Sequence, residues 1–126
     1  MTGRRKNWHP NWSSRAKYTA LSFETPQDVA HQLGDAGLLQ RHFESLVVFP
    51  PRLPRSSESL PLAHVWIDAL TEAFVGPMEL IRLITPRLRR GRGDLARLVL
   101  ISGITSVQVM GKYAQNSAIR CAWLGA

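Results

Sequence analysis

The sequence predicts an α/β fold, in which a small parallel sheet of about three strands has helices on both sides. Two observations predict this fold. Short apolar runs, typical of buried strands, alternate with stretches in which apolar residues recur at helical spacing. The segments follow one another in the order strand, helix, strand, helix, strand, helix, which favours parallel strands joined by right-handed crossovers. With 126 residues and no internal repeat, the chain is long enough for one domain and one modest core.

A polar arm precedes the predicted domain. Residues 1–17 are basic and contain Trp8 and Trp12 but no apolar run, which predicts a flexible segment rather than a secretory signal. Residues 18–126 form the single predicted domain. No stretch of the chain approaches the roughly 20 apolar residues of a membrane span. The lone cysteine, Cys121, cannot form an internal disulfide and lies in no metal-ligand pattern, so we expect a cytoplasmic protein without a metal site.

The first predicted strand and helix follow one another directly. YTALSF, residues 18–23, predicts a short strand. The helix after it has Thr25 as its N-cap, and either Gly34 or Gly37 would end it. One face of this helix carries two apolar residues four positions apart, Val29 and Leu33.

The middle of the chain predicts a second strand and one long helix. FESLVVFPP, residues 43–51, contains a continuous apolar run bounded by prolines, which suits a strand buried on both faces. A loop rich in proline and serine separates it from the helix over 62–88. Pro77 lies inside this helix, where we expect a kink or a break, and Gly76 beside it permits close approach of another backbone. The apolar stripe of the helix comprises Trp66, Leu70, Phe74, Met78, Ile81, Ile84 and Leu88.

The end of the chain predicts a third strand and a third helix. RLVLIS, residues 97–102, is another apolar run of the buried-strand kind, and GITSVQVMG, residues 103–111, is a loop. From Lys112 the chain can form a helix that reaches Trp123. Tyr113 then lies near the start of this helix.

The chain is strongly basic. Its net charge is +7, a balance that favours polyanions, and the densest basic segment is PRLRRGRGD, residues 86–94. This segment is either a nucleic-acid surface or a solvated helix end, where the helix dipole favours cations. No aromatic residue is interleaved with these arginines to stack a base, so nucleic-acid binding is the weaker interpretation.

Over residues 18–126 the chain resembles part of a short-chain dehydrogenase/reductase. The long helix has a Gly-Pro step, and a basic loop follows it. A hydrophobic strand then ends in Ser102, and a helix starts near Tyr113. The resemblance implies a partial Rossmann-like three-layer domain and an oxidoreductase that transfers hydride to or from NAD(P).

The resemblance also implies which residues would be catalytic. In the family, a tyrosine donates or accepts the proton and a serine orients the substrate oxygen, which points to Tyr113 and Ser102. An equally fair alignment puts Gly103 in the serine position. Ser106 is a third candidate, only seven residues before the tyrosine.

Several features depart from the family pattern. The chain has no glycine-rich turn to approach a cofactor pyrophosphate, and the bulky stretch 49–51 stands where the family has Asn-Ala-Gly. The helix asparagine of the family, which supports a proton relay, falls near Ala73. The family also has a lysine four residues after the tyrosine, which lowers the tyrosine pKa and holds the cofactor ribose. Ser117 occupies that position here.

These departures set the expected function. Without a nearby cation, a phenol keeps a pKa of about 10 and is a poor base at neutral pH. We therefore expect a degenerate, non-catalytic relative that works as a subunit or interaction module, with no cofactor bound to the isolated chain. The alternative is an NAD(P)-dependent oxidoreductase that uses Tyr113 and Ser102 while a partner or further chain supplies the cofactor turn. A basic nucleic-acid-binding module is the second alternative.

Association with another chain is the corresponding partner prediction. We expect a homo-oligomer or hetero-oligomer formed through the helix over 62–88 and the helix that starts near Lys112. The sequence suggests the surface involved, since a second apolar strip lies off the main stripe of the long helix. Its members are Ala63, Ile67, Leu80 and Leu83.

Overall fold

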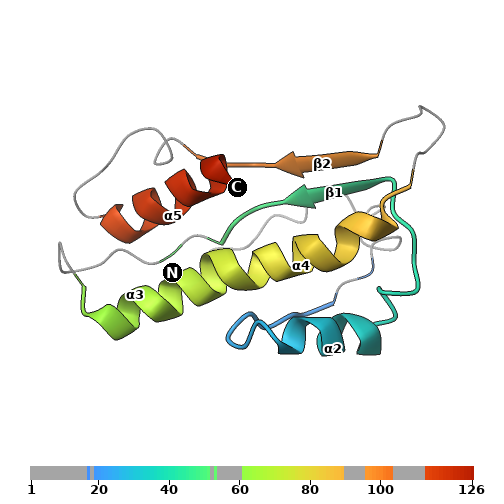
Figure 1. Ribbon diagram of the computed structural model, residues 1–126, viewed down its shortest axis with the longest axis horizontal. Helices are drawn as coiled ribbons and strands as arrows, with labels where there is room; N and C mark the ends of the chain where they lie inside the picture. The colour runs from blue at the N-terminus through green and yellow to red at the C-terminus, as the bar shows by residue number, and fades with distance from the viewer. Residues whose placement is uncertain (1–16, 18, 52, 54–60, 90–95, 104–112) are drawn as a thin grey trace, which may run out of the picture.

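A computed structural model of the chain shows a two-stranded sheet above a long helical run (Figure 1). It describes residues 17, 19–51, 53, 61–89, 96–103 and 113–126. Helix α2 lies on the far side of the helical run from the sheet, and α5 lies beside the first part of the run. The elements are α2 (Asp28–Asp35), β1 (Ser45–Val48), α3 (Ala63–Leu70), the π-helical turn η1 (Thr71–Val75), α4 (Gly76–Ile84), the 3-10 turn η2 (Thr85–Arg87), β2 (Arg97–Leu100) and α5 (Ala114–Gly125).

The sheet is parallel, as predicted, and pairs β1 with β2. The register runs from Ser45 opposite Arg97 to Val48 opposite Leu100. A mixed α/β fold with a small parallel sheet is therefore confirmed. The described part of the sheet has two strands rather than the three expected, because the first predicted strand does not pair.

The strand expected at residues 18–23 was a wrong prediction, because residues 19–23 belong to no strand. A side-chain amide takes the place of a neighbouring strand. Gln32 Oε1 accepts a hydrogen bond from the amide of Ser22 at 2.7 Å, and Gln32 Nε2 donates to the carbonyl of Ser22 at 2.9 Å. The side chains still alternate, since Leu21 and Phe23 pack against a core cluster while Ser22 is exposed. The predicted alternation of packed and exposed side chains was therefore correct, but the backbone pairs with the side chain of Gln32 and not with another strand.

Helix α2 confirms the buried pair predicted for it and corrects its ends. Val29 and Leu33 are both buried. The helix begins at Asp28, with Gln27 rather than Thr25 in the N-cap position. It ends at Asp35, and Gly37, just after the C-cap residue Ala36, has a φ of 68°, which is favourable for a residue without a side chain. The amide of Gly37 donates to Gly34 and the amide of Leu38 donates to Leu33, the paired bonds of a Schellman cap.

The long helix predicted over 62–88 is present as a continuous helical run whose pitch changes in the middle. The amide of Gly76 donates to the carbonyl of Thr71, five residues back, in the π-helical turn η1. A π turn holds one residue more than an α turn, so it accommodates apolar positions that step by four several times in succession. The irregularity expected at Pro77 is therefore a π turn just ahead of the proline.

Gly76 also brings two segments together. A Cβ on this residue would lie 2.6 Å from the Cβ of Phe23, which is closer than real Cβ atoms approach. The close neighbour of Gly76 is thus the side chain of Phe23, where the approach of another backbone was expected. The extended segment before α2 therefore packs directly on the helical run.

Two core clusters hold the helices and sheet together. The first joins α5 to the start of the helical run and the second joins α2 to its end. The main stripe therefore divides between two partners rather than facing the sheet alone. The buried residues of the first cluster are Leu53, Ala69, Ala73, Ile119 and Trp123, and those of the second are Val29, Leu33 and Ile84.

The two faces of the sheet differ. Leu100 points toward α4, and Val48 lines the same cavity between the sheet and that helix. Their neighbours in the strands, Val47 and Val99, are exposed, and Phe49 just beyond β1 is 70% exposed. Among the described residues, helices therefore cover one face of the sheet, whereas both faces were expected to be covered. None of the described helices is long and apolar enough to cross a membrane.

Candidate functional site

The two predicted catalytic residues lie near the carboxyl end of β2 and at the start of α5. Ser102 lies just beyond the carboxyl end of β2, and Tyr113 occupies the N-cap position of α5. The Ser102 Oγ atom is buried and has no hydrogen-bond partner. The Tyr113 phenol is therefore not hydrogen-bonded to it. Ser106 and Lys112 lie outside the described residues.

Small buried residues occupy the two positions where the resemblance implies polar catalytic groups. Ser117, four residues after Tyr113, is 1% exposed. Ala73, at the position of the family asparagine, is fully buried in the first core cluster. Both positions face packed interior in this chain. Neither has space beside it for a longer side chain without rearrangement of the core.

The backbone carbonyl of Ala73 also has a partner. Proline has no amide hydrogen, so Pro77 cannot donate to the carbonyl four residues before it, which is that of Ala73. The indole Nε1 of Trp123 donates to this carbonyl instead, at 3.0 Å. The same indole meets Phe74 edge to face, with ring centroids 5.1 Å apart and planes at 71°. Trp123 therefore completes the helix next to its proline and joins α5 to it.

Asn116 fastens the loop after β1 to α5. Its Oδ1 accepts from the amide of Leu53 at 3.1 Å, and its Nδ2 donates to the carbonyl of Leu53 at 2.9 Å. Pro50 and Pro51 lack amide hydrogens, so these two residues and Leu53 offer no free backbone donor. In the family, this loop approaches the cofactor. The residues present here do not fit that role.

The sequence reasoning missed the buried amides of α5. Asn116 and its neighbour Gln115 are both buried, and the Gln115 Nε2 donates to the carbonyl of Val65 at 3.3 Å. Two consecutive amides in a helix that also carries core residues are the signal that could have found them, because buried polar side chains need partners. The partners themselves lie 50 and 63 residues away in sequence.

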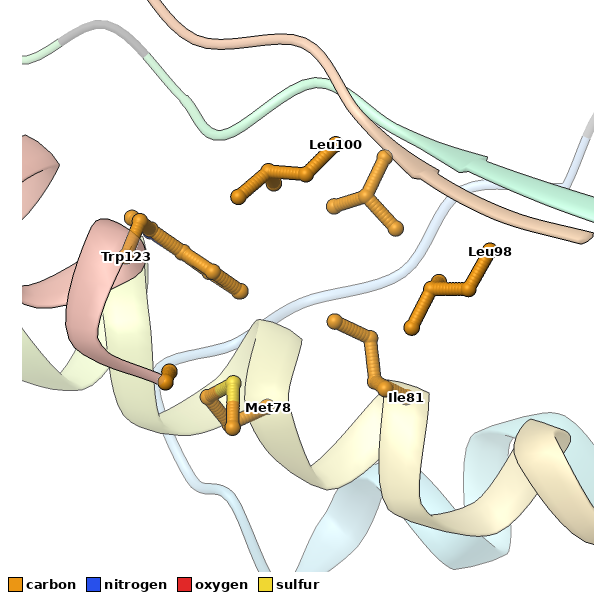
Figure 2. Close-up of a pocket in the computed structure, with 7 residues that line it drawn as sticks. Met78, Ile81, Leu98, Leu100 and Trp123 are labelled. Carbon is orange, nitrogen blue, oxygen red and sulfur yellow. The ribbon is translucent and has the colours of Figure 1, made fainter.

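A cavity of about 140 Å³ lies between the sheet and the two helices below it (Figure 2). Its lining is almost wholly apolar and includes neither Ser102 nor Tyr113. A cavity without hydrogen-bonding groups can hold an apolar group but cannot polarise a substrate. The lining residues are Val48, Met78, Ile81, Leu98, Leu100, Trp123 and Ala126.

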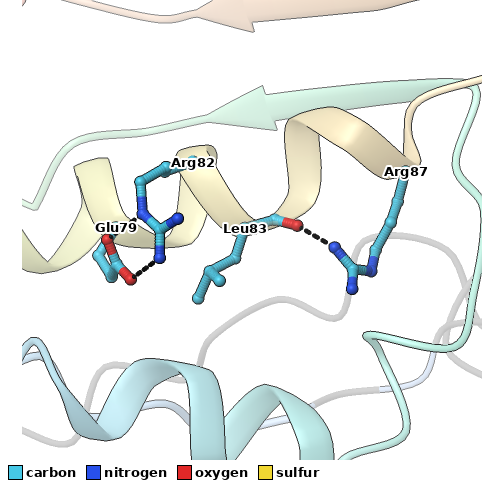
Figure 3. Close-up of polar contacts among 4 residues, drawn as sticks. All are labelled: Glu79, Arg82, Leu83 and Arg87. Atoms are coloured by element: carbon cyan, nitrogen blue, oxygen red, sulfur yellow. Dashed lines mark hydrogen bonds and ion pairs between the residues drawn. The ribbon is translucent and has the colours of Figure 1, made fainter.

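In the described part of the basic segment, Arg87 makes hydrogen bonds within the fold. Arg87 donates from Nη1 to the carbonyl of Leu83 at 2.6 Å (Figure 3). It also donates from Nε to the carbonyl of Leu39 at 2.6 Å. It thereby satisfies a carbonyl in the last turn of α4, as a cation at a helix end should. Nearby on the same helix, the hydrogen bonds from Arg82 hold the pKa of the Glu79 carboxyl below its ordinary value.

The second apolar strip is half covered. Leu80 and Leu83 pack against the α2 cluster, so they are not available to another chain. Ala63 and Ile67 remain exposed, with Ile67 at 63%. The prediction of an exposed apolar strip was therefore wrong for the two residues on α4. On α3 the strip is exposed, and Leu62 just before that helix is exposed as well.

Comparison of the chain with protein-family models, curated proteins and solved structures finds no match in any of the three.

Proposed function

We propose that the chain is a degenerate relative of the short-chain dehydrogenases, with a partial Rossmann-like fold, that works as a non-catalytic subunit in the cytoplasm. The observation that carries this proposal is the burial of Ser117, which stands where the family needs a lysine. A serine supplies no charge to lower the pKa of a neighbouring phenol. A phenol without such a charge is a poor base at neutral pH, which favours a non-catalytic role for the chain.

The polar contacts of α5 support the same proposal. The Ala73 carbonyl accepts the Trp123 indole, and Asn116 holds the loop after β1 against α5. Groups that would serve a proton relay or a cofactor are instead engaged in holding helices and a loop together. In this proposal, these groups have a structural role, and the function of the chain depends on its surface.

Association is the role we assign to that surface. Leu62 and Ile67 leave an apolar area on α3 in water, where an apolar contact with a second chain would bury it. We propose a homo-oligomer or hetero-oligomer formed through this side of the helical run, with α5 beside it.

A cofactor titration tests the non-catalytic part of the proposal. NADH and NADPH are titrated into the protein while the fluorescence of its four tryptophans is followed, with calorimetry as the second measurement. We expect no saturable quenching in the low micromolar range, because the cofactor-facing residues do not fit. Tight binding of either nucleotide would refute the proposal and favour the enzyme that uses Tyr113 and Ser102.

The Ser117→Lys variant is the second arm of this test. We expect no oxidation of NADPH with a panel of small ketones, because groups that act as a unit are not restored one at a time. Circular dichroism checks that the variant is folded, since Ser117 is buried. Turnover by the folded variant above that of the wild type would contradict the proposal.

A further inference from the structure

The cavity between the sheet and the helices has walls from the sheet, α4 and α5. Val48 and Leu100 lie opposite each other in the pairing of β1 with β2, and both line it. Leu98, two residues before Leu100, lies on the same face of the sheet. Met78 and Ile81, three residues apart on α4, form the facing wall. Figure 2 shows the two leucines directed toward these helix residues across the cavity.

The third wall is the indole of Trp123, and other contacts already fix its position. Its Nε1 donates to the Ala73 carbonyl at 3.0 Å, and its ring meets Phe74 edge to face. Met78 differs, because an unbranched thioether side chain can adapt to the shape of a group beside it. A ligand would therefore meet one preformed wall and one adaptable wall, so that little ordering is needed on binding.

The cavity is apolar along its length and extends from the core to the surface. None of the side chains that line it carries a charge, and the one N–H group among them, on Trp123, already has an acceptor. Val48 and Trp123 are 8% and 4% exposed, whereas Leu98 is 50% exposed. A ligand can thus reach the cavity from solvent, but its buried part would find no hydrogen-bond partner among these side chains.

We propose that this cavity is a binding site for an uncharged hydrocarbon group of about six carbons, either aromatic or aliphatic. Its volume of about 140 Å³ is close to the roughly 150 Å³ of an apolar cavity that admits benzene. Left empty, it forfeits contacts of the atoms that line it, and a hydrocarbon would restore them. The site does not depend on the proposed non-catalytic function, because neither Ser102 nor Tyr113 lines it.

The test is an NMR titration of the full-length ¹⁵N,¹³C-labelled protein with benzene, and separately with cyclohexane. We expect saturable shifts of the Trp123 indole N–H and of the Leu100 and Ile81 methyl groups in at least one arm. The arm with the tighter binding shows whether the site prefers an aromatic or an aliphatic group. The indole of Trp66, which does not line the cavity, should not shift. Absence of a saturable shift in both arms, or equal shifts at Trp66, overturns the proposal.

A polar ring of the same size tests the chemistry of the site. Pyrazine matches benzene in shape but has nitrogen atoms at opposite ends of the ring, so at least one of them would be buried without a donor. We expect pyrazine to bind about tenfold more weakly than benzene, or less tightly still, because a buried polar group without a partner is costly. Binding of pyrazine as tight as that of benzene would overturn the assignment of an apolar ligand.

Filling the cavity with a side chain tests its location. Leu100→Phe should weaken hydrocarbon binding by about tenfold or more, because the added ring atoms occupy the space of the ligand. Val99→Phe is the matched control, since Val99 is the next residue on β2, is exposed and does not line the cavity. Circular dichroism checks that each variant is folded, and Ile81→Phe fills the cavity from the helix side if Leu100→Phe does not fold. Binding that survives the filling variant, or that falls equally with Val99→Phe, would overturn the proposal.

Discussion

At the scale of single residues, the chain repeats one device, in which a side chain takes the place of a missing backbone group. Gln32 pairs with the backbone of Ser22, and Asn116 pairs with the backbone of Leu53, each through one donor and one acceptor. Trp123 supplies the N–H that Pro77 lacks. Sequence patterns placed Tyr113 at the start of a helix correctly. They could not find these pairs, because the periodicity of one segment carries no information about which distant segment its polar side chains contact.

The Trp123→Phe variant measures the contribution of the indole hydrogen bond. The substitution keeps an aromatic ring against Phe74 but removes the indole N–H that donates to the buried Ala73 carbonyl. We expect the free energy of unfolding to fall by about 1–3 kcal/mol, the cost of an unsatisfied buried polar group together with some lost packing. Urea denaturation followed by circular dichroism provides the measurement.

Trp66→Phe is the matched control for this prediction. Trp66 is only partly buried, and its indole makes no hydrogen bond with the described part of the chain. Its loss should cost less than the loss at Trp123. Equal destabilisation by the two variants would mean that ring volume, rather than the hydrogen bond to Ala73, sets the effect.

At the scale of elements, the sequence predicted helices better than strands. The existence of a long helix followed from its apolar stripe, and its irregular middle followed from Pro77, but the π turn required the structure. The strand expected at 18–23 failed for a physical reason, since alternation reports which side chains are buried and does not report what the backbone pairs with. The strands that do form, β1 and β2, are the two runs that lie on the same side of the helical run.

The Gly76→Ala variant tests the packing of the extended segment on the helical run. A methyl group at this position would lie 2.6 Å from the Cβ of Phe23, so one of the two backbones must move. We expect the free energy of unfolding to fall by about 1–3 kcal/mol, as is typical of overpacking. Thermal and urea denaturation would both report it.

Gly34→Ala is the control for the glycine substitution itself. A Cβ at Gly34 meets nothing closer than Leu39 at 4.0 Å, and the residue lies within α2. Alanine should be neutral there or stabilise the helix by up to about 1 kcal/mol. If Gly76→Ala were as well tolerated as this control, the close packing of Phe23 against the helix would be refuted.

At the scale of the whole molecule, the apolar surface is distributed unevenly. Helices cover the inner face of the sheet, while Val47, Phe49 and Val99 are exposed on its outer face, and Ile67 is exposed on α3. A small monomer seldom leaves so much apolar surface in water. The overall α/β character followed from the alternation of segments, whereas the extent of uncovered surface depended on how many of those segments pair.

The Ile67→Asp variant tests whether α3 mediates association. If the wild-type chain forms oligomers through this helix, a carboxylate at its centre should weaken them by a few kcal/mol, because a charge buried without a partner is costly. Light scattering over a range of protein concentrations would show a shift to monomer. Because Ile67 is 63% exposed, the fold itself should tolerate the change.

Gln40→Asp adds the same charge at an exposed polar position after α2, and it should leave the assembly intact. Leu83→Asp is unsuitable for this purpose, since Leu83 packs against the α2 cluster. A wild-type chain that stays monomeric at tens of micromolar would contradict the association, as would an assembly that Ile67→Asp does not affect.

The parallel pairing of β1 with β2 also sets the order in which the chain can fold. Parallel strands cannot meet through a tight turn, so the connection through α3 and α4 must be compact before Ser45 comes opposite Arg97. Closing such a long loop is entropically costly and becomes favourable only when the contacts it makes are in place. We therefore expect the helical run to form early in folding. The bonds from Asn116 to Leu53, which span 63 residues, would form late and lock the loop onto an assembled core.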